Sequence, residues 1–150
     1  MSEKEYMDID GIRKILKQRY PFLMVDRILE IETGKKIRAL KNVTINEPFF
    51  QGHFPERPVM PGIMMIEAMA QSGALLLILS DEDRNGKDFF LGGADKVRFR
   101  KLVRPGDQLI IDVEFLRKRS SISKVKARCS VDGELVSEGE FMAVMEKSKA

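Results

Sequence analysis

The chain has 150 residues, of which 43% are hydrophobic and 33% charged, so it fits one globular domain with a core of its own. The single cysteine, Cys129, excludes an intramolecular disulfide and indicates a reducing compartment. The acidic residues 1–10 are unlike a signal peptide, and the apolar stretch 63–79 carries Glu67 and Gln71, which argues against a membrane span. We therefore predict one domain over residues 1–150 in the cytoplasm.

The net charge of +3 is distributed unevenly along the chain. Residues 84–128 hold thirteen basic and five acidic side chains, whereas the segments on either side are net acidic. A basic middle segment indicates an acidic partner, because clustered charge accelerates and orients association. Charge alone leaves open whether that partner is nucleic acid, a membrane or an acidic protein.

The first third of the chain predicts a short helix and a hairpin. The helix runs from residue 11 to about 18 behind Asp10 as its cap. Two strands follow at 24–32 and 35–44, joined at Thr33 and Gly34. Residues 46–61 carry four prolines, which is typical of an ordered loop rather than a strand.

The rest of the chain predicts one long helix and four strands. The helix covers about 61–79 and is apolar nearly all round, which is typical of a buried helix. The strands cover 89–100, 108–117, 121–131 and 134–145, with connections at 104–107, 118–120 and Asp132-Gly133. An antiparallel sheet wrapped around a long central helix, an α+β fold, is the packing that this element order favours.

His53 is the only histidine, and it lies in the proline-rich loop directly before the long helix. Such loops often hold catalytic groups in place. The structural alternative is a histidine that only packs within its loop. Any histidine chemistry of this chain therefore depends on His53.

Glu67 lies in the middle of the apolar helix, where a charged carboxylate is costly unless it is paired. A carboxyl in such an environment suits a proton donor, and Gln71, one turn further, could hold it in place. The alternative is that both residues serve only as core hydrogen-bonding groups. Gly62, at the start of the helix, exposes backbone N–H groups where negative charge could develop.

Other chemistries find less support. One histidine without a cysteine cluster does not make a metal site. Cys129 alternates with apolar residues and is expected to be a core thiol. No glycine-rich nucleotide loop followed by a helix is present.

Residues 52–62 (GHFPERPVMPG) and 67–71 (EAMAQ) resemble the signature of the bacterial β-hydroxyacyl-[acyl carrier protein] dehydratases of the FabZ type. The likeness continues, in order along nearly the whole chain, through residues 19–27, 95–99 and 104–107. Two positions depart from the family pattern. Gln18 stands where many relatives have histidine, and Phe89-Phe90 where many have a tyrosine that gates the acyl tunnel.

The resemblance implies a hot-dog fold and a homodimer, commonly a trimer of dimers, whose active sites each take the histidine and the glutamate from opposite subunits. It implies that His53 is the base and Glu67 the acid in dehydration of (3R)-hydroxyacyl-[acyl carrier protein] to the trans-2-enoyl product, in type II fatty-acid synthesis. Glutamate at position 67 favours the plain dehydratase over the related enzyme that also isomerises the double bond. No cofactor, metal, nucleic acid or membrane is implied.

The resemblance also assigns supporting roles. The Gly62 N–H would bind the thioester carbonyl, the Val59 carbonyl would fix the imidazole tautomer, and Gln71 and Phe90 would contact the substrate. The basic residues expected to dock the acidic carrier protein are Lys96, Arg98, Arg100 and Lys101, of which the first three are predicted to share one face of a strand. Charge that merely protects an edge strand is the alternative for each of them.

Two other functions stay open at the level of sequence. One is a hot-dog thioesterase or enoyl-thioester hydratase that acts on coenzyme A esters. The other is a catalytically silent module that binds acyl chains or nucleic acid. The second predicts binding that falls with salt and survives the loss of His53. The basic strand is expected to lack exposed aromatic residues on which single-stranded nucleic acid would stack, which argues weakly against nucleic-acid binding.

Overall fold

The computed structural model describes residues 6–81, 87–119 and 121–147, so part of the predicted acidic N-terminal segment and of the 118–120 connection lies outside the described residues. Two α-helices, one 3-10 helix and six strands follow each other along the chain. Their bounds are α1 Ile9–Ile15, β1 Arg27–Glu32, β2 Lys36–Asn42, η1 Pro48–Gln51, α2 Gly62–Leu79, β3 Lys87–Phe99, β4 Gln108–Arg117, β5 Ile122–Val131 and β6 Glu134–Lys147.

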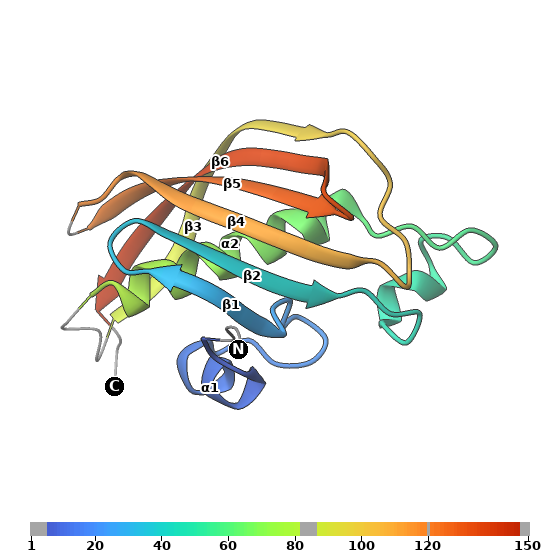
Figure 1. Ribbon diagram of the computed structural model, residues 1–150, viewed down its shortest axis with the longest axis horizontal. Helices are drawn as coiled ribbons and strands as arrows, with labels where there is room; N and C mark the ends of the chain where they lie inside the picture. The colour runs from blue at the N-terminus through green and yellow to red at the C-terminus, as the bar shows by residue number, and fades with distance from the viewer. Residues whose placement is uncertain (1–5, 82–86, 120, 148–150) are drawn as a thin grey trace.

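All six strands form one antiparallel sheet in the order β1-β2-β4-β5-β6-β3. Figure 1 shows α2 lying along one face of this sheet, with α1 beside the β1 edge. Residues from the helix and from the inner face of the strands fill a single apolar core, which includes Met69, Leu76, Ile111 and Phe141. The predicted architecture, an antiparallel sheet wrapped around a long central helix, is confirmed.

The predicted bounds hold for most strands, but β1 begins at Arg27, three residues later than predicted. β4 begins and ends where the sequence placed it, and the Asp132-Gly133 hairpin is confirmed, with φ of +50° and +81° as a type I′ turn requires. The prediction for α1 was wrong by two residues at its start and by about three at its end. Its cap is Asp8, whose side chain accepts from the Gly11 N–H at 3.1 Å, and Asp10 lies inside the first turn.

The long helix α2 is not buried on every face, contrary to the sequence prediction. The side toward the sheet is buried, but a stripe along the other side stays open, and at its start the Ile63 side chain is 67% exposed. This stripe consists of Ile63, Ile66, Glu67, Ala70 and Ala74. One sheet covers one side of a helix, so the apolar stripe needs another cover. By length and composition alone α2 would also suffice for a membrane span, which the sequence analysis had excluded, although half of its residues are buried within the fold.

The outer face of the sheet carries two rows of charged side chains, which we call the charge rows. Opposed strands place acidic and basic residues alternately across the sheet in both rows. The first row is Glu30, Arg38, Asp112, Arg128, Glu138 and Arg98, and the second is Glu32, Lys36, Glu114, Lys126 and Glu140.

Several members of the charge rows form ion pairs. Arg38 Nε lies 2.7 Å from Asp112 Oδ1, and Asp112 raises the pKa of the Arg38 guanidinium. The Arg100 guanidinium lies 2.5 Å from Glu138 and lowers the pKa of that carboxyl. Because opposite charges stand directly across from each other, the pattern favours one register of the strands over its neighbours.

Candidate active site

His53 lies in a loop that its own backbone hydrogen bonds hold rigid. The His53 N–H donates to the carbonyl of Phe49, within η1, at 3.1 Å, and the Val59 N–H donates to the His53 carbonyl at 3.0 Å. At the base of the loop, Lys41 and Glu47 form an ion pair of 2.6 Å with only 5% and 12% of their side chains exposed. The loop therefore presents His53 from a fixed platform.

The orientation of the His53 ring defines its protonation pattern. Its Nδ1 lies 2.8 Å from the Val59 carbonyl oxygen, and a carbonyl only accepts. Nδ1 therefore carries the hydrogen, which leaves the lone pair of a neutral imidazole on Nε2. The ring also stacks on Phe54, with 4.2 Å between the ring centroids. The role that the family resemblance implies for the Val59 carbonyl is compatible with this 2.8 Å contact.

A pocket of about 550 Å³ opens beside His53. Most of its wall is apolar, and Phe54, Ile63, Phe99 and Leu102 are all largely exposed side chains there. Gly62, the first residue of α2, belongs to the same wall. A Cβ at Gly62 would come within 2.8 Å of the Phe99 ring, so any other residue there would require this ring to move. The first N–H groups of α2, which have no partner inside the helix, thus lie at this pocket.

Glu67 is held by Gln71, as the sequence suggested. Gln71 Nε2 donates to Glu67 Oε2 at 2.7 Å and to the Phe22 carbonyl at 2.5 Å, while its Oε1 accepts from the Met24 N–H at 2.7 Å. The side chain of Gln71 is 99% buried, and these three bonds use both hydrogens and the oxygen of its amide. Gln71 therefore ties the carboxyl of Glu67 to the segment that precedes β1.

Glu67 and Gln71 line a second pocket, of about 180 Å³, between α2 and the strands β3, β5 and β6. Gln18 and the predicted substrate contact Phe90 line it as well. Its other walls are mostly apolar, with small residues of α2 opposite larger ones of the sheet. The shape suits an unbranched apolar chain.

The predicted site residues thus fall into two groups within one chain. His53, Val59 and Gly62 line the first pocket, and Glu67, Gln71 and Phe90 line the second. Neither pocket contains both His53 and Glu67. A single copy of the chain, as far as it is described, does not bring the two predicted catalytic groups into one pocket.

The four predicted docking residues lie at the end of β3 and just after it. The strict alternation that would align Lys96, Arg98 and Arg100 is interrupted, because β3 has a bulge between Asp95 and Arg98, where Lys96 takes a φ of +54°. Lys96 pairs with Glu140 at 3.6 Å, Arg100 pairs with Glu138, and Lys101 pairs with Glu134. Three of the four cations therefore already have carboxylate partners.

Several residues that line the pockets were not predicted from the sequence. Phe99 and Leu102, which lie about 40 positions after the His53 loop in the sequence, line the first pocket. Gln18 lines the second pocket. Arg57 was part of the recognised segment but was given no role, although it lines the His53 pocket. Only the fold shows these neighbours, because they come from segments far apart in sequence.

Alternative reactive groups find no support in the described residues. Cys129 is fully buried, and burial raises the pKa of its thiol to about 12, so it is an inert core thiol. Within residues 6–81, 87–119 and 121–147, no group of three or more histidine, cysteine or acidic side chains is placed to hold a metal ion. A third pocket, of about 450 Å³, lies between the charge rows and contains none of the predicted site residues.

Comparison with known proteins identifies the family. The model of the FabA-like domain matches residues 16–140. A 3-hydroxyacyl-[acyl-carrier-protein] dehydratase FabZ from Caldicellulosiruptor bescii is 56% identical over 135 residues, which are 90% of this chain and 96% of the relative. Another from Polaromonas naphthalenivorans is 57% identical over 143 residues, 93% and 97% of the two chains. The chain belongs to the FabZ-type dehydratases.

Solved structures confirm the hot-dog fold of this FabZ-type chain. It superposes with a TM-score of 0.75 on the dehydratase heterocomplex ApeI:P from Xenorhabdus doucetiae, at 16% identity and with 91% of both chains covered. A protein from Streptococcus mutans bound to acetyl CoA gives a TM-score of 0.65 at 16% identity, with 90% and 98% covered. At such identities these structures share the fold alone. The family prediction from residues 52–62 and 67–71 is confirmed.

Proposed function

We propose that the FabZ-type chain removes water from (3R)-hydroxyacyl chains carried on acyl carrier protein, giving the trans-2-enoyl thioester of fatty-acid synthesis. The names of its relatives and their coverage support this substrate class. The reaction would take place in the cytoplasm. The phosphopantetheine arm of acyl carrier protein would bring the thioester to the His53 pocket. No metal or cofactor is needed, because elimination requires only a base, an acid and a stabilised carbonyl oxygen.

His53 acts as the base in this proposal, and its hydrogen bond to Val59 is the observation that carries it. With Nδ1–H donating to the Val59 carbonyl at 2.8 Å, Nε2 is free to take the α-proton of the thioester. The electron pair of that C–H bond becomes the new double bond between the α- and β-carbons. The helix N-terminus at Gly62 stabilises the charge that develops on the thioester carbonyl.

Glu67 acts as the acid. As the bond between the β-carbon and its hydroxyl breaks, Glu67 gives its proton to the departing oxygen, which leaves as water. The catalyst is restored when the proton on His53 returns to Glu67 through solvent. Gln71 fixes the orientation of the carboxyl through its bond to Oε2, so that the other oxygen faces the substrate.

The complete site, in our proposal, forms between two copies of the chain. His53 and Glu67 line different pockets of one chain, and the open stripe of α2 offers apolar surface that a second copy would cover. A two-fold pairing would set the His53 of each copy against the Glu67 of the other and so give two equivalent sites. Such dimers would assemble further as a trimer of dimers.

The test is to identify the product. Purified chain is incubated with a 3-hydroxyacyl thioester on acyl carrier protein, and the conjugated enoyl thioester is followed by absorbance. Dehydration predicts an enoyl product from wild type and none from His53→Ala or Glu67→Gln, with all three proteins folded by circular dichroism. Release of free acid would instead identify a thioesterase. Turnover that survives His53→Ala would contradict the role of the base.

A further inference from the structure

The basic side chains at the His53 pocket differ from those on the outer face of the sheet. Arg57 lines the pocket. Arg104 lies beside it, because its Nε donates to the carbonyl of Pro58, the residue that follows Arg57, at 3.3 Å. Two arginines from distant segments, residues 54–58 and 103–107, therefore lie near one edge of the pocket.

Neither arginine has an acidic partner. Among the residues that the structure describes, no carboxylate lies within ion-pair distance of Arg57 or Arg104, whereas Lys96, Arg100 and Lys101 all have one. Asp107, the acidic residue nearest to Arg104 in sequence, accepts from the Arg104 backbone N–H at 2.8 Å instead. The positive charges of these two arginines thus have no carboxylate partner among the described residues.

The backbone holds these two cations in place. The Met60 N–H donates to the Val103 carbonyl at 2.8 Å, which ties the loop of Arg57 to that of Arg104. Arg57 itself lies in a tight turn, in which the Phe54 and Arg57 N–H groups bond each other's carbonyls at 3.2 and 3.1 Å. An anion at this edge of the pocket would be attracted by the positive charges of both arginines. Planar guanidinium groups match the geometry of phosphate oxygens.

We propose that Arg57 and Arg104 bind the phosphate of the pantetheine arm that carries the substrate. The inference rests on the proposed function and extends it to the part of the substrate that does not react. An acyl carrier protein joins its arm through a phosphodiester, and coenzyme A carries the same arm on a phosphate, so both share the chemistry that this pair recognises. The contact would anchor the arm at the rim while its thioester end reaches His53.

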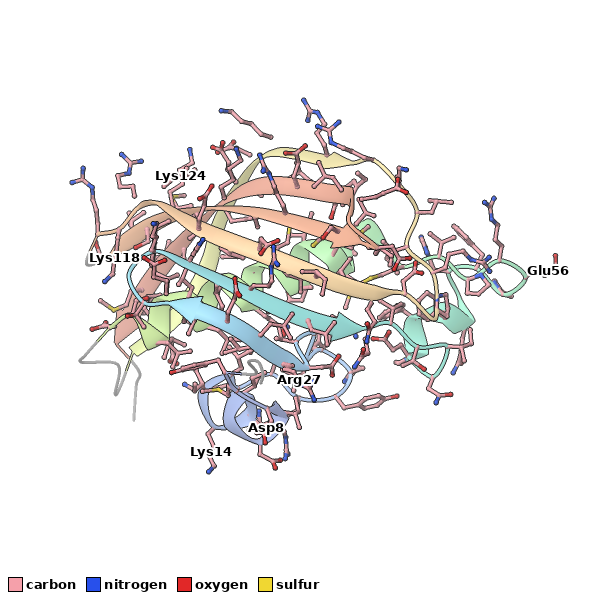
Figure 2. The ribbon with its side chains drawn as sticks, viewed as in Figure 1. Asp8, Lys14, Arg27, Glu56, Lys118 and Lys124 are labelled. Carbon is pink, nitrogen blue, oxygen red and sulfur yellow. The ribbon has the colours of Figure 1, made fainter. Side chains whose placement is uncertain are left out.

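The test compares one 3-hydroxyacyl group on three carriers: acyl carrier protein, coenzyme A and N-acetylcysteamine, which has no phosphate. The variants are Arg57→Gln, Arg104→Gln and the double variant. Arg117→Gln is the matched control. It removes an exposed cation at the end of β4, next to Lys118, and Figure 2 places Lys118 at the opposite end of the molecule from Glu56, the neighbour of Arg57.

Each arginine variant is expected to lose about tenfold in kcat/KM with both phosphate-bearing carriers, mostly through KM, as one charge-assisted hydrogen bond to an anion predicts. The loss with N-acetylcysteamine is expected to be much smaller, and Arg117→Gln should behave as wild type. Equal losses on all three carriers would overturn the phosphate contact. A loss confined to acyl carrier protein would also overturn it, because it would indicate contact with the protein surface instead.

Binding without turnover separates this inference from the proposed function. Calorimetry with phosphopantetheine and with pantetheine, which differ only in the phosphate, measures the phosphate contact directly. The proposal predicts tighter binding of phosphopantetheine to wild type, and no such difference in the double variant. A wild type that dehydrates none of the three substrates would refute the dehydratase activity, whereas equal binding of the two probes would refute the phosphate site.

Discussion

The outer face of the sheet and the rim of the His53 pocket differ in how their charged side chains are paired and in how much apolar surface they expose. On the outer face, acidic and basic side chains alternate across the strands, and most of the cations stand opposite a carboxylate. At the rim, Arg57 and Arg104 lack one, and Phe54, Ile63, Phe99 and Leu102 leave apolar surface open. On the outer face, the pairing of opposite charges is what a stable, solvent-exposed surface requires. The rim instead has unpaired positive charge and exposed apolar side chains, as expected where a substrate and a second copy would bind.

The largest effect on stability is expected at the base of the His53 loop. Lys41→Met leaves Glu47 as a buried carboxylate without its partner and should cost about 3–5 kcal/mol. The control is Lys35→Met, which breaks an exposed pair with Glu32 and should change the free energy of unfolding by less than about 1 kcal/mol. Chemical denaturation measures both. Equal effects would mean that the loop is not anchored by this pair.

Gln71→Met tests the connection between Glu67 and the segment before β1. The change leaves the buried Met24 N–H without its partner and should cost about 1–3 kcal/mol, while the carbonyl of the exposed Phe22 can turn to water. It should also lower kcat more than it raises KM, because Glu67 loses its orientation. Gln51→Met, at an exposed position of the loop, is the control. A purely structural role would lower stability and leave kcat of the folded enzyme unchanged.

Cys129 makes the stability of the fold depend on alkaline pH. Burial raises the pKa of its thiol from 9.0 to about 12, so above pH 9 the unfolded chain loses this proton while the folded chain keeps it. The folded state binds more protons there, and stability therefore falls as pH rises through this range. Thiol alkylation near pH 9 should accordingly follow unfolding. Rapid alkylation of the native protein would contradict the burial of Cys129.

Substitutions in the charge rows should have the smallest effect on the free energy of unfolding. This effect should depend on the signs of the charges that stand opposite each other. Arg38→Asp places like charges beside Asp112 and should destabilise the sheet by about 0.2–1 kcal/mol. Adding Asp112→Arg restores this one pair but sets like charges opposite Glu30 and Arg128, so it should recover little of the loss. The effect should shrink with added salt. A double variant as stable as wild type would mean that the Arg38–Asp112 pair acts alone and that the row as a whole does not contribute.

The sheet and its central helix were predictable because each depends on local pattern. Period-two alternation and the Asp132-Gly133 turn define β4, β5 and β6, and the proline loop followed by an apolar run defines α2. The open stripe of α2 was not predictable, since hydrophobicity shows that a residue needs cover but not which surface supplies it. The cap of α1 was misplaced because Asp8 and Asp10 satisfy the same sequence rule.

The candidate residues of the site could be singled out from the sequence, but their arrangement could not. His53, Glu67 and Gln71 are unusual for their surroundings, and their motif is specific, so each stood out as a candidate. That His53 and Glu67 line separate pockets is a property of the fold. The bulge at Lys96 broke the alternation on which the docking stripe depended. Arg57 and Arg104 lie 47 positions apart in sequence, and no pattern along the chain links them.

The most direct test of the account mixes two inactive variants. Chains carrying His53→Ala and Glu67→Gln, with different affinity tags, are co-expressed, and assemblies that contain both are purified. If each site takes His53 from one copy and Glu67 from the other, a mixed dimer holds one intact site, and dehydration should return to about half of the wild-type rate. If both groups act within one chain, every site in the mixture lacks one of them. Mixed assemblies that stay as inactive as the single variants would contradict the shared site.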